Sequence, residues 1–160
     1  MGDTAYTGAQ ARYYDEYFTG LEGETGFYAA LSREVGSPVL ELGCGTARTM
    51  LPIAASGLRI VGLDASTQML AMAAQKVESV LPRALAANIA LLCADMRRFR
   101  LRRRFRLVIL PYRTFQHLLT DDDQEALVQY GQSLEDTNAD GVGEVSEAYL
   151  KPAGRIVGYE

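Results

Sequence analysis

Cysteine and tryptophan are scarce in this sequence. Its 160 residues include no tryptophan and only two cysteines, Cys44 and Cys93. Two cysteines without the paired spacing of metal ligands exclude a disulfide-stabilised or zinc-stabilised framework, and they predict free thiols in a reducing cytosol. We therefore expect a cytoplasmic protein with no metal among its cofactors.

Long apolar runs and a large excess of one charge are also missing. No run approaches the roughly 18 apolar residues of a membrane span, and residues 1–4 do not begin a signal peptide. A net charge of −4 gives no global reason to expect a nucleic acid or an anionic membrane as partner. Hydrophobic residues make up 48% of the chain, and its length is enough for one domain with a real core.

One stretch combines an apolar run, two close glycines and a helical pattern. Residues 39–42 predict a buried strand, Gly43 and Gly45 break it, and apolar residues from Met50 onward recur at helical spacing. Such a unit gathers backbone N–H groups and the positive end of a helix around one point, and glycine leaves no Cβ between backbone and ligand. The unit predicts a cofactor cradle; glycines needed only for turn geometry are the alternative.

An acidic residue stands where a ribose would be bound. The strand pattern of residues 58–63 ends in Asp64, nineteen residues after Gly45. An acid at the end of the second strand of a doubly wound sheet lies beside the first turn, where it can accept both ribose hydroxyls. Dinucleotide-binding enzymes share this arrangement, but their G-x-G-x-x-G pattern needs a small residue where this chain has Arg48. An NAD-dependent enzyme is therefore a disfavoured alternative.

Two segments resemble one enzyme family. Glu41-Leu42-Gly43-Cys44-Gly45-Thr46-Ala47 resembles the S-adenosylmethionine-binding signature of class I methyltransferases, E/D-x-G-x-G-x-G/A. Residues 111–118 are similar to the Asn-Ser/Thr-Phe-x-His-Leu segment of glycine N-methyltransferase-like and amino-sugar N-methyltransferase-like proteins. The matching residues are Thr114, Phe115, His117 and Leu118, whereas Arg113 replaces a small polar residue or asparagine. The resemblance covers about residues 11–130 and 146–158.

The resemblance implies an α/β fold, with a doubly wound, mostly parallel, Rossmann-like sheet, strand order 3-2-1-4-5 and helices on both faces. The expected strands are 39–42, 58–63, 89–93, 105–110 and a fifth after the turn in 149–155. Residues 1–36 are expected to form an N-terminal helical lid, and residues 37–160 the cofactor-binding domain. Because the sequence ends at Glu160, strands six and seven are expected to be absent. Either the sequence is a fragment, or a second copy or a partner chain covers the incomplete sheet edge.

Local signals predict where helices begin and end. A helix is expected over residues 9–19 and another over 25–35. The helix after the glycine turn is expected to end at Gly57 and to be bent or shortened by Pro52. Ser66 is expected to cap a helix that runs to about Val80. The acids that follow Thr120 are expected to begin a helix and not to bind a metal.

The same resemblance implies which residues hold S-adenosylmethionine. Asp95, just past the third strand, would accept a hydrogen bond from the adenine amine, with simple turn formation as the alternative. Tyr14 would close over the methionine end of the cofactor, with plain packing as the alternative. The carbonyl near Leu110 would take the ammonium group. The expected cofactor-binding residues are Tyr14, Glu41, Gly43, Cys44, Gly45, Asp64, Ala65, Met69, Asp95, Met96 and Leu110.

The expected reaction is methyl transfer to a nitrogen or oxygen atom of a small molecule. Tyr17, Tyr112 and Arg113 are expected to contact this acceptor, and the guanidinium of Arg113 favours a carboxylate or phosphate on it. His117, the only histidine, is either a general base or a structural hydrogen-bonding residue. A non-catalytic or incomplete S-adenosylmethionine-binding domain is the alternative function.

Seven arginines lie within residues 97–106. They predict either an RNA-binding ridge or phosphate clamp, or a solvated surface turn that is balanced by the twenty acids of the chain. The acidic net charge favours the surface turn.

Overall fold

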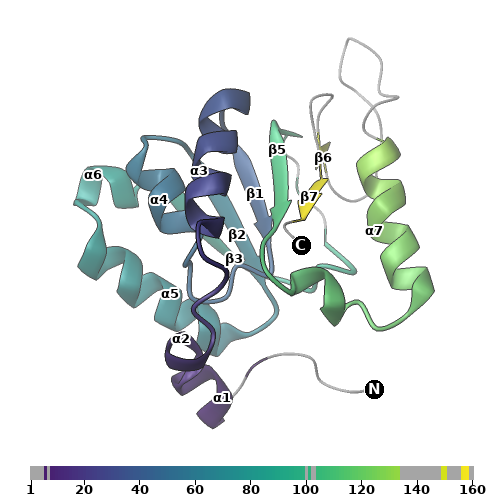
Figure 1. Ribbon diagram of the computed structural model, residues 1–160, viewed down its shortest axis with the longest axis horizontal. Helices are drawn as coiled ribbons and strands as arrows, with labels where there is room; N and C mark the ends of the chain where they lie inside the picture. Colours follow the sequence, from purple (N-terminus) through teal and green to yellow (C-terminus); the bar gives the residue numbers. More distant parts are fainter. Residues whose placement is uncertain are drawn as a thin grey trace.

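The computed structural model describes Tyr6 and residues 8–99, 101, 104–133, 149–150 and 156–158. At its centre lies a parallel sheet (Figure 1). The strands β1 (Val39–Leu42), β2 (Ile60–Asp64), β3 (Ile89–Cys93) and β5 (Leu107–Leu110) stand in the order β3-β2-β1-β5. The short strand β7 (Ile156–Gly158) pairs with β5 at one side. This is the predicted Rossmann-like strand order, which is therefore confirmed.

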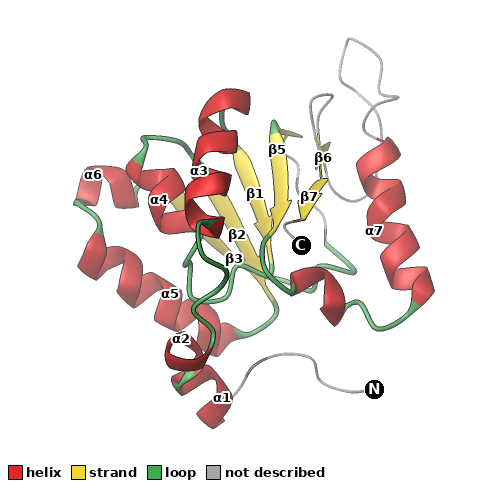
Figure 2. Cartoon of the chain, viewed as in Figure 1, coloured by secondary structure: helices red, strands yellow, loops and turns green. Residues whose placement is uncertain are grey.

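Helices cover both faces of the sheet (Figure 2). On one face, α3 (Glu24–Val35), α4 (Met50–Ala55) and α5 (Thr67–Val80) supply buried side chains to a cluster that contains Val39 of β1. On the other face, α7 (Asp121–Ser133) supplies Leu127 to a cluster that contains Leu40 of the same strand. Because successive strand residues point to opposite faces, strands buried on both faces are apolar without interruption. This explains the continuous apolar runs of the sequence.

The topology places a crevice beside β1. Val39 is in register with Ile60 of β2 on one side and with Leu107 of β5 on the other, and all three strands run parallel. The chain winds outward in both directions from β1, so the segments after β1 and β5 diverge at the carboxyl edge of the sheet. A cofactor site in a sheet of this winding lies at that edge.

The N-terminal region forms two short helices where one was predicted. The expected helix over 9–19 is divided into α1 (Gly8–Arg12) and α2 (Tyr14–Tyr17), with Tyr13 between them at φ −101° and ψ 9°. The side chains of Asp15, Thr46 and Lys76 hold α2 against the glycine turn and α5: the Thr46 hydroxyl donates to Asp15 over 2.5 Å, and the Lys76 ammonium donates to Thr46 over 3.0 Å and to Asp15. The region is thus anchored next to the cradle.

The helix that follows the glycine turn shows why proline is accepted there. α4 begins at Met50, so Pro52 falls in the first helical turn, where its missing N–H would have no partner in the helix. The helix has six residues, which agrees with shortening, one of the two effects expected of Pro52. Gly57 follows the C-cap of α4 at φ 80°, as predicted.

Other boundaries follow the predicted signals. The Ser66 hydroxyl accepts a hydrogen bond of 3.2 Å from the Met69 N–H at the start of α5, and Thr120 accepts one of 3.1 Å from the Asp123 N–H at the start of α7. The remaining helices are α6 (Arg83–Ala86) and the 3₁₀ turn η1 (Thr114–His117). Both predicted caps are confirmed.

The predicted fourth strand, 105–110, is interrupted at Arg106. β5 begins only at Leu107, while β4 (Arg104–Phe105) pairs with β6 (Tyr149–Leu150) in a separate two-stranded sheet. The guanidinium of Arg106 donates to the Val35 carbonyl over 3.2 Å, next to the end of α3. The predicted turn at 151–155 and three of the seven arginines, at positions 100, 102 and 103, lie outside the described residues.

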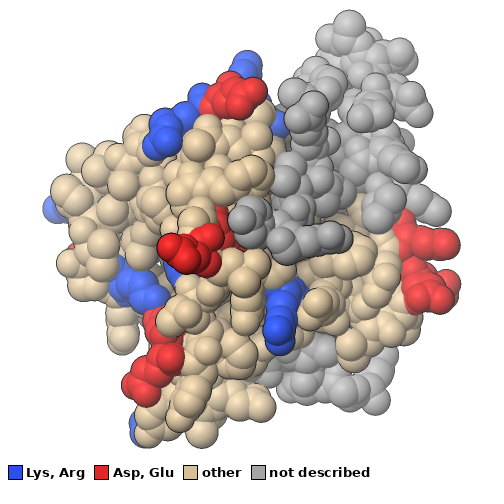
Figure 3. All heavy atoms as spheres, in the orientation of Figure 1, with Lys and Arg blue, Asp and Glu red and all other residues tan. Residues whose placement is uncertain are grey.

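Charge and hydropathy of the described residues give two further findings. In the described part of the chain, no helix is long and apolar enough to cross a membrane. On the face drawn in Figure 3, basic and acidic side chains alternate over the described surface. This mixture of signs is typical of a solvated surface and not of a nucleic-acid-binding patch.

Candidate active site

The glycine turn between β1 and α4 has a left-handed backbone conformation that residues with a side chain rarely adopt. Gly43 and Gly45 have φ values of 66° and 53°, and Ala47 adopts φ 66° although it carries a Cβ. A Cβ built on Gly43 would lie 2.5 Å from Cγ2 of Thr114, which comes from the segment after β5. The glycine at 43 is therefore required both by conformation and by the close approach of a second segment.

The positive end of α4 contributes less than the sequence suggested. α4 has six residues and begins at Met50, five positions after Gly45. A helix this short has a small dipole. Its N-terminal end is separated from Gly45 by the four residues 46–49. The backbone of the glycine turn itself, and not the helix end, is what lines the crevice.

Asp64 is tied to this turn by hydrogen bonds. Its Oδ2 accepts from the Gly45 N–H over 2.9 Å, and its Oδ1 accepts from the Ser66 N–H over 2.8 Å. A carboxylate has about four acceptor positions, so each oxygen keeps one free. Asp64 can therefore accept two further hydrogen bonds, which is the number that a ribose diol offers.

Glu41 is a buried acid below the turn. Its side chain is 2% exposed, and its Oε2 has no hydrogen-bond partner in the described part of the chain. Burial raises the pKa of the Glu41 carboxyl well above its ordinary value, and the nearby Arg48 lowers it only in part. An unpartnered buried oxygen at the edge of a cavity is a site for a donor on a ligand.

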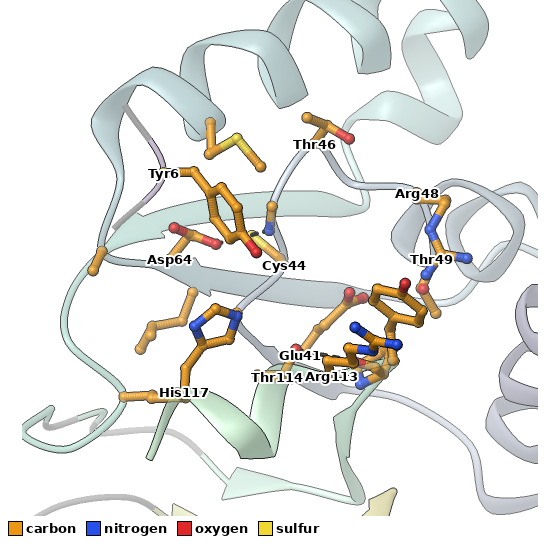
Figure 4. A pocket seen from close by; sticks show the side chains of 18 of the residues that line it. Tyr6, Glu41, Cys44, Thr46, Arg48, Thr49, Asp64, Arg113, Thr114 and His117 are labelled. Atoms are coloured by element: carbon orange, nitrogen blue, oxygen red, sulfur yellow. Dashed lines mark hydrogen bonds between the residues drawn. The ribbon is translucent and has the colours of Figure 1, made fainter. Parts of the chain in front are cut away.

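A cavity of about 420 Å³ opens between these groups (Figure 4). This volume is in the range of small-molecule sites. Nearly all the predicted cofactor-binding residues line it: Tyr14, Glu41, Gly43, Cys44, Gly45, Asp64, Ala65, Met69, Asp95 and Met96. The predicted acceptor and catalytic residues that line it are Tyr112, Arg113 and His117.

Two predicted residues do not line the cavity. The side chain of Leu110 is 2% exposed and packs in the core, and the next residue, Pro111, lines the cavity in its place. Tyr17 is 77% exposed and lies outside it. Tyr13, four residues earlier, is exposed as well, at 44%, so this position does not support a contact between Tyr17 and the acceptor.

Other cavity residues were not predicted. They are Tyr6, Phe18, Thr46, Arg48, Thr49, Leu63, Arg97, Pro111, Thr114 and Gln116. Arg48 was considered only as evidence against a dinucleotide, and Thr114 only as part of a motif. The aromatic residues at 6 and 18 carried no signal, since their role depends on how the N-terminal segment folds back.

Aromatic side chains cover the cavity from the N-terminal side. Tyr6 meets Tyr14 at 5.0 Å between ring centroids and His117 at 5.6 Å, both edge-to-face, and Tyr14 meets Phe18 at 5.0 Å. Burial, as the main cause, raises the pKa of Tyr14 to about 12. The Tyr14 hydroxyl therefore stays protonated and can donate a hydrogen bond into the cavity.

Charged groups lie at both ends of the cavity. The carboxylate of Asp95 is held by Arg97 through the backbone N–H at 2.9 Å and through the guanidinium, and this hydrogen bonding lowers the pKa of the Asp95 carboxyl. At the opposite end Arg48 forms an ion pair of 2.7 Å with the fully buried Glu24.

Burial also raises the pKa of the Cys44 thiol, so this cysteine stays protonated and is a poor nucleophile.

These features define the class of the domain. A glycine turn after the central strand, an acid after the second strand and a cavity at the switch point are typical of doubly wound α/β domains that bind a nucleoside cofactor. The model of a family described as a methyltransferase domain matches residues 39–136, which is more than half of the chain. The chain belongs to this methyltransferase domain family.

Solved structures share its fold. The CcbJ methyltransferase from Streptomyces caelestis aligns with a TM-score of 0.78 and 24% identity, over 98% of this chain and 58% of that one. DesVI from Streptomyces venezuelae aligns with a TM-score of 0.67 and 24% identity, over 96% and 58%. The glycopeptide N-methyltransferase MtfA, complexed with S-adenosyl-L-methionine, aligns with a TM-score of 0.65 and 22% identity, over 84% and 53%.

The chain spans somewhat more than half the length of these solved proteins. No protein among the curated sequences matches it. The family match bears out the resemblance to methyltransferases and does not support the NAD-dependent alternative.

Proposed function

We propose that this domain binds S-adenosylmethionine and transfers its methyl group to a nitrogen or oxygen atom of a small molecule. The observation that carries the proposal is the hydrogen-bonded pair of Asp64 and Gly45 at the mouth of the cavity. It joins the sugar-binding acid to the glycine turn in one rigid unit. Family membership and the fold of the complexed MtfA support the same cofactor.

The residues of the cavity fit this cofactor at three points. We assign the ribose hydroxyls to the free lone pairs of Asp64, and the adenine to the space between Met69, Asp95 and Met96. We assign the ammonium of the methionine end to Glu41, whose Oε2 is buried without a partner among the described residues. A donor supplied there would satisfy an oxygen that otherwise costs about 1–3 kcal/mol of desolvation.

The protein's contribution to the reaction is mainly alignment. When bound, S-adenosylmethionine supplies an electrophilic methyl group on a sulfonium, so the chemistry needs an acceptor lone pair directed at that carbon, opposite the sulfur. Tyr6, Tyr14 and Phe18 exclude water from that position. Because apolar enclosure strengthens the electrostatic contacts inside it, this cover also strengthens binding.

We propose that His117 receives the proton that the acceptor loses. It lines the cavity from η1, and its ring is held edge-on by Tyr6. Imidazole is the side chain whose charge changes most readily near neutral pH. We assign His117 the role of general base. General-base catalysis typically increases the reaction rate by about 10²–10⁴-fold.

The test of the proposed function is a binding cycle. Isothermal titration with S-adenosylhomocysteine and with its 2′,3′-dideoxy analogue is carried out on the wild type and on Asp64→Ala. We expect the wild type to bind S-adenosylhomocysteine with a micromolar dissociation constant, about −8 kcal/mol. The dideoxy analogue, which lacks the ribose hydroxyls, should bind the wild type much more weakly than S-adenosylhomocysteine does, whereas Asp64→Ala should bind both ligands about equally. Equal losses in both proteins would contradict the sugar contact, and no binding to the wild type would contradict the proposed function.

Two further assignments complete the proposal. Residues 1–36 act as a lid, supported by the anchoring of α2 to Thr46 and Lys76. The protein acts in a reducing compartment such as the cytoplasm, supported by the free thiols of Cys44 and Cys93. A second copy of the chain at the sheet edge would be detected by sedimentation equilibrium as a dimer.

A further inference from the structure

Arg113 stands at the acceptor end of the cavity. It follows Tyr112, whose backbone has φ 57°, a conformation that is uncommon for a residue with a side chain. The guanidinium of Arg113 lies over the Tyr112 ring, with Cζ 5.5 Å from the ring centroid. Stacking on an aromatic face limits the positions open to the guanidinium and leaves its N–H groups free to bind in the plane. The side chain is therefore exposed but oriented.

The other positive charges of the cavity are already compensated. Arg48 forms an ion pair of 2.7 Å with Glu24, and Arg97 forms one of 2.5 Å with Asp95. Arg113 makes no ion pair with any described residue, although it lines the same cavity. Of the described arginines that line this cavity, Arg113 alone forms no ion pair with a described acid.

Glu41, a buried acid that also lines the cavity, does not supply the missing charge. Burial keeps the pKa of Glu41 well above its ordinary value, so this carboxyl is less ionised near neutral pH than a solvated one. In addition, Figure 4 shows Arg113 at the same end of the cavity as Glu41, on the opposite side from Asp64 and Tyr6. A guanidinium that lines a small-molecule cavity without an ion pair is available to an anion on the ligand.

We propose that the methyl acceptor carries a carboxylate and that Arg113, held on the Tyr112 ring, binds it. This inference rests on the proposed function and adds the substrate class to it. A guanidinium forms two parallel hydrogen bonds with a carboxylate, which fixes the direction of the acceptor as well as its charge. Arg113 is thus a specificity-determining residue for the acceptor, and Tyr112 is a positioning residue.

A carboxylate fits this setting better than a phosphate. Phosphate sites combine several donors, commonly a helix N-terminus or a lysine together with arginine. Among the described residues that line the cavity there is no lysine, and Arg113 offers one guanidinium beside a 3₁₀ turn of four residues. The single planar guanidinium of Arg113 matches a carboxylate, which is planar and carries one negative charge.

The transfer step is balanced without a further reactant. The acceptor's nitrogen or oxygen lone pair forms a bond to the methyl carbon, the bond from that carbon to sulfur breaks, and its electron pair stays on sulfur in S-adenosylhomocysteine. The acceptor loses one proton, which passes to the imidazole of His117 and from there to solvent. The carboxylate on Arg113 takes no part in bond making, so it acts through orientation alone.

The test follows the Arg113 Nε–Hε resonance by NMR in the 160-residue chain saturated with S-adenosylhomocysteine. The probes are two matched pairs, glycine with glycinamide and 4-aminobenzoate with 4-aminobenzamide, and inorganic phosphate. Arg113→Lys identifies the resonance by its loss. We expect at least one carboxylate to shift the signal saturably, with its amide at least tenfold weaker, which corresponds to about 1.4 kcal/mol.

Three outcomes would overturn the inference. The first is the absence of any shift of the Arg113 signal with up to about 20 mM carboxylate. Binding that fails at this concentration is far weaker than that of a ligand with a millimolar dissociation constant. The second is a stronger shift with phosphate than with either carboxylate. The third is a carboxylate preference, measured by calorimetry, that survives in Arg113→Gln.

The affinity for S-adenosylhomocysteine separates this inference from the proposed function. We expect Arg113→Gln to bind it within about twofold of the wild type, because the acceptor and not the cofactor meets this guanidinium. A loss of more than tenfold would instead assign Arg113 to the cofactor's own carboxylate and overturn the acceptor inference. If the wild type does not bind S-adenosylhomocysteine at all, the proposed function itself fails. Tyr112→Phe keeps the ring and should keep the carboxylate preference, whereas Tyr112→Leu should weaken it.

Discussion

The carboxylate of Asp64 and the backbone N–H of Gly45 are joined by a hydrogen bond of 2.9 Å across nineteen residues of sequence. The second oxygen of Asp64 accepts from the Ser66 N–H over 2.8 Å. The acid therefore organises the protein before any ligand arrives. Substitution of Asp64 is therefore expected to change the folded state as well as the proposed cofactor site.

Asp64→Asn is expected to destabilise the protein without cofactor by about 1–3 kcal/mol, because an amide can accept only one of the two backbone N–H groups and leaves the other unpaired. Chemical denaturation followed by circular dichroism measures the change. Asp95→Asn is the matched control at the end of the next strand. Asp95 is 38% exposed there, so the same substitution should cost less than about 1 kcal/mol. Equal losses at both positions would contradict the structural role of Asp64.

Gly62 in β2 leaves room for side chains above the sheet. A Cβ at this position would overlap the sulfur of Met50 and lie 2.7 Å from the sulfur of Cys44. Met50 is fully buried and cannot move aside into solvent. Gly62→Ala is therefore expected to lower the free energy of unfolding by about 1–3 kcal/mol, measured by urea denaturation.

Gly26 gives the opposite expectation for the same substitution. It lies within α3 and is exposed, and a Cβ added there would meet nothing within 4 Å beyond its own helix and chain neighbours. Gly26→Ala should raise stability by about 0.4–1 kcal/mol, because alanine favours the helix and restricts the unfolded chain. A destabilised Gly26→Ala together with a neutral Gly62→Ala would contradict the packing around these two glycines.

The buried acid Glu41 predicts a pH dependence. Its folded-state pKa is raised above the ordinary value of 4.5, chiefly by burial. Unfolding above that value therefore releases a proton, so the contribution of Glu41 to stability is present at low pH and is lost as pH rises toward the folded-state pKa. The melting temperature of the wild type should fall relative to that of Glu41→Gln as the pH rises above the ordinary value of 4.5. A constant difference would show that Glu41 has the same pKa in both states.

The contact of α2 with the glycine turn predicts a coupling between the N-terminal region and ligand affinity. Asp15→Ala removes the acceptor for both Thr46 and Lys76 and should weaken S-adenosylhomocysteine binding several-fold, since the tyrosine next to it covers the cavity. The ion pair is partly exposed, so the effect on stability should stay below about 1 kcal/mol. Calorimetry and thermal unfolding measure the two quantities. Glu16→Ala, on the exposed side of the same helix, is the matched control and should leave both unchanged.

The central sheet could be predicted from the sequence because each strand is a continuous apolar run buried on both faces. The limits of β1 and β3 agree with the predicted ranges to the residue. The strand 105–110 was too long, since nothing in its composition marks Arg106 as the point where the chain leaves the sheet. Strand pairing decides such an end, and pairing is a long-range property.

The cavity was predicted best where the backbone sets the position. Residues directly after β1, β2 and β3 were found from their place at strand ends, as Gly43, Asp64 and Asp95 show. Tyr6 and Phe18 were missed because their positions depend on how the N-terminal segment docks. Tyr17 belongs to the same region and is exposed outside the cavity.

The contact of Thr114 with Gly43 has a consequence for how acceptor preference can change. The side chain of Thr114, next to Arg113 in the chain, rests directly on Gly43, which has no side chain of its own. A bulkier residue at 114 would push against the turn and disturb cofactor geometry, whereas positions 113 and 116 face the cavity without this restriction. Substitutions at positions on either side of Thr114 can therefore change which acceptor is bound. Thr114 itself cannot become larger, because Gly43 packs directly against it.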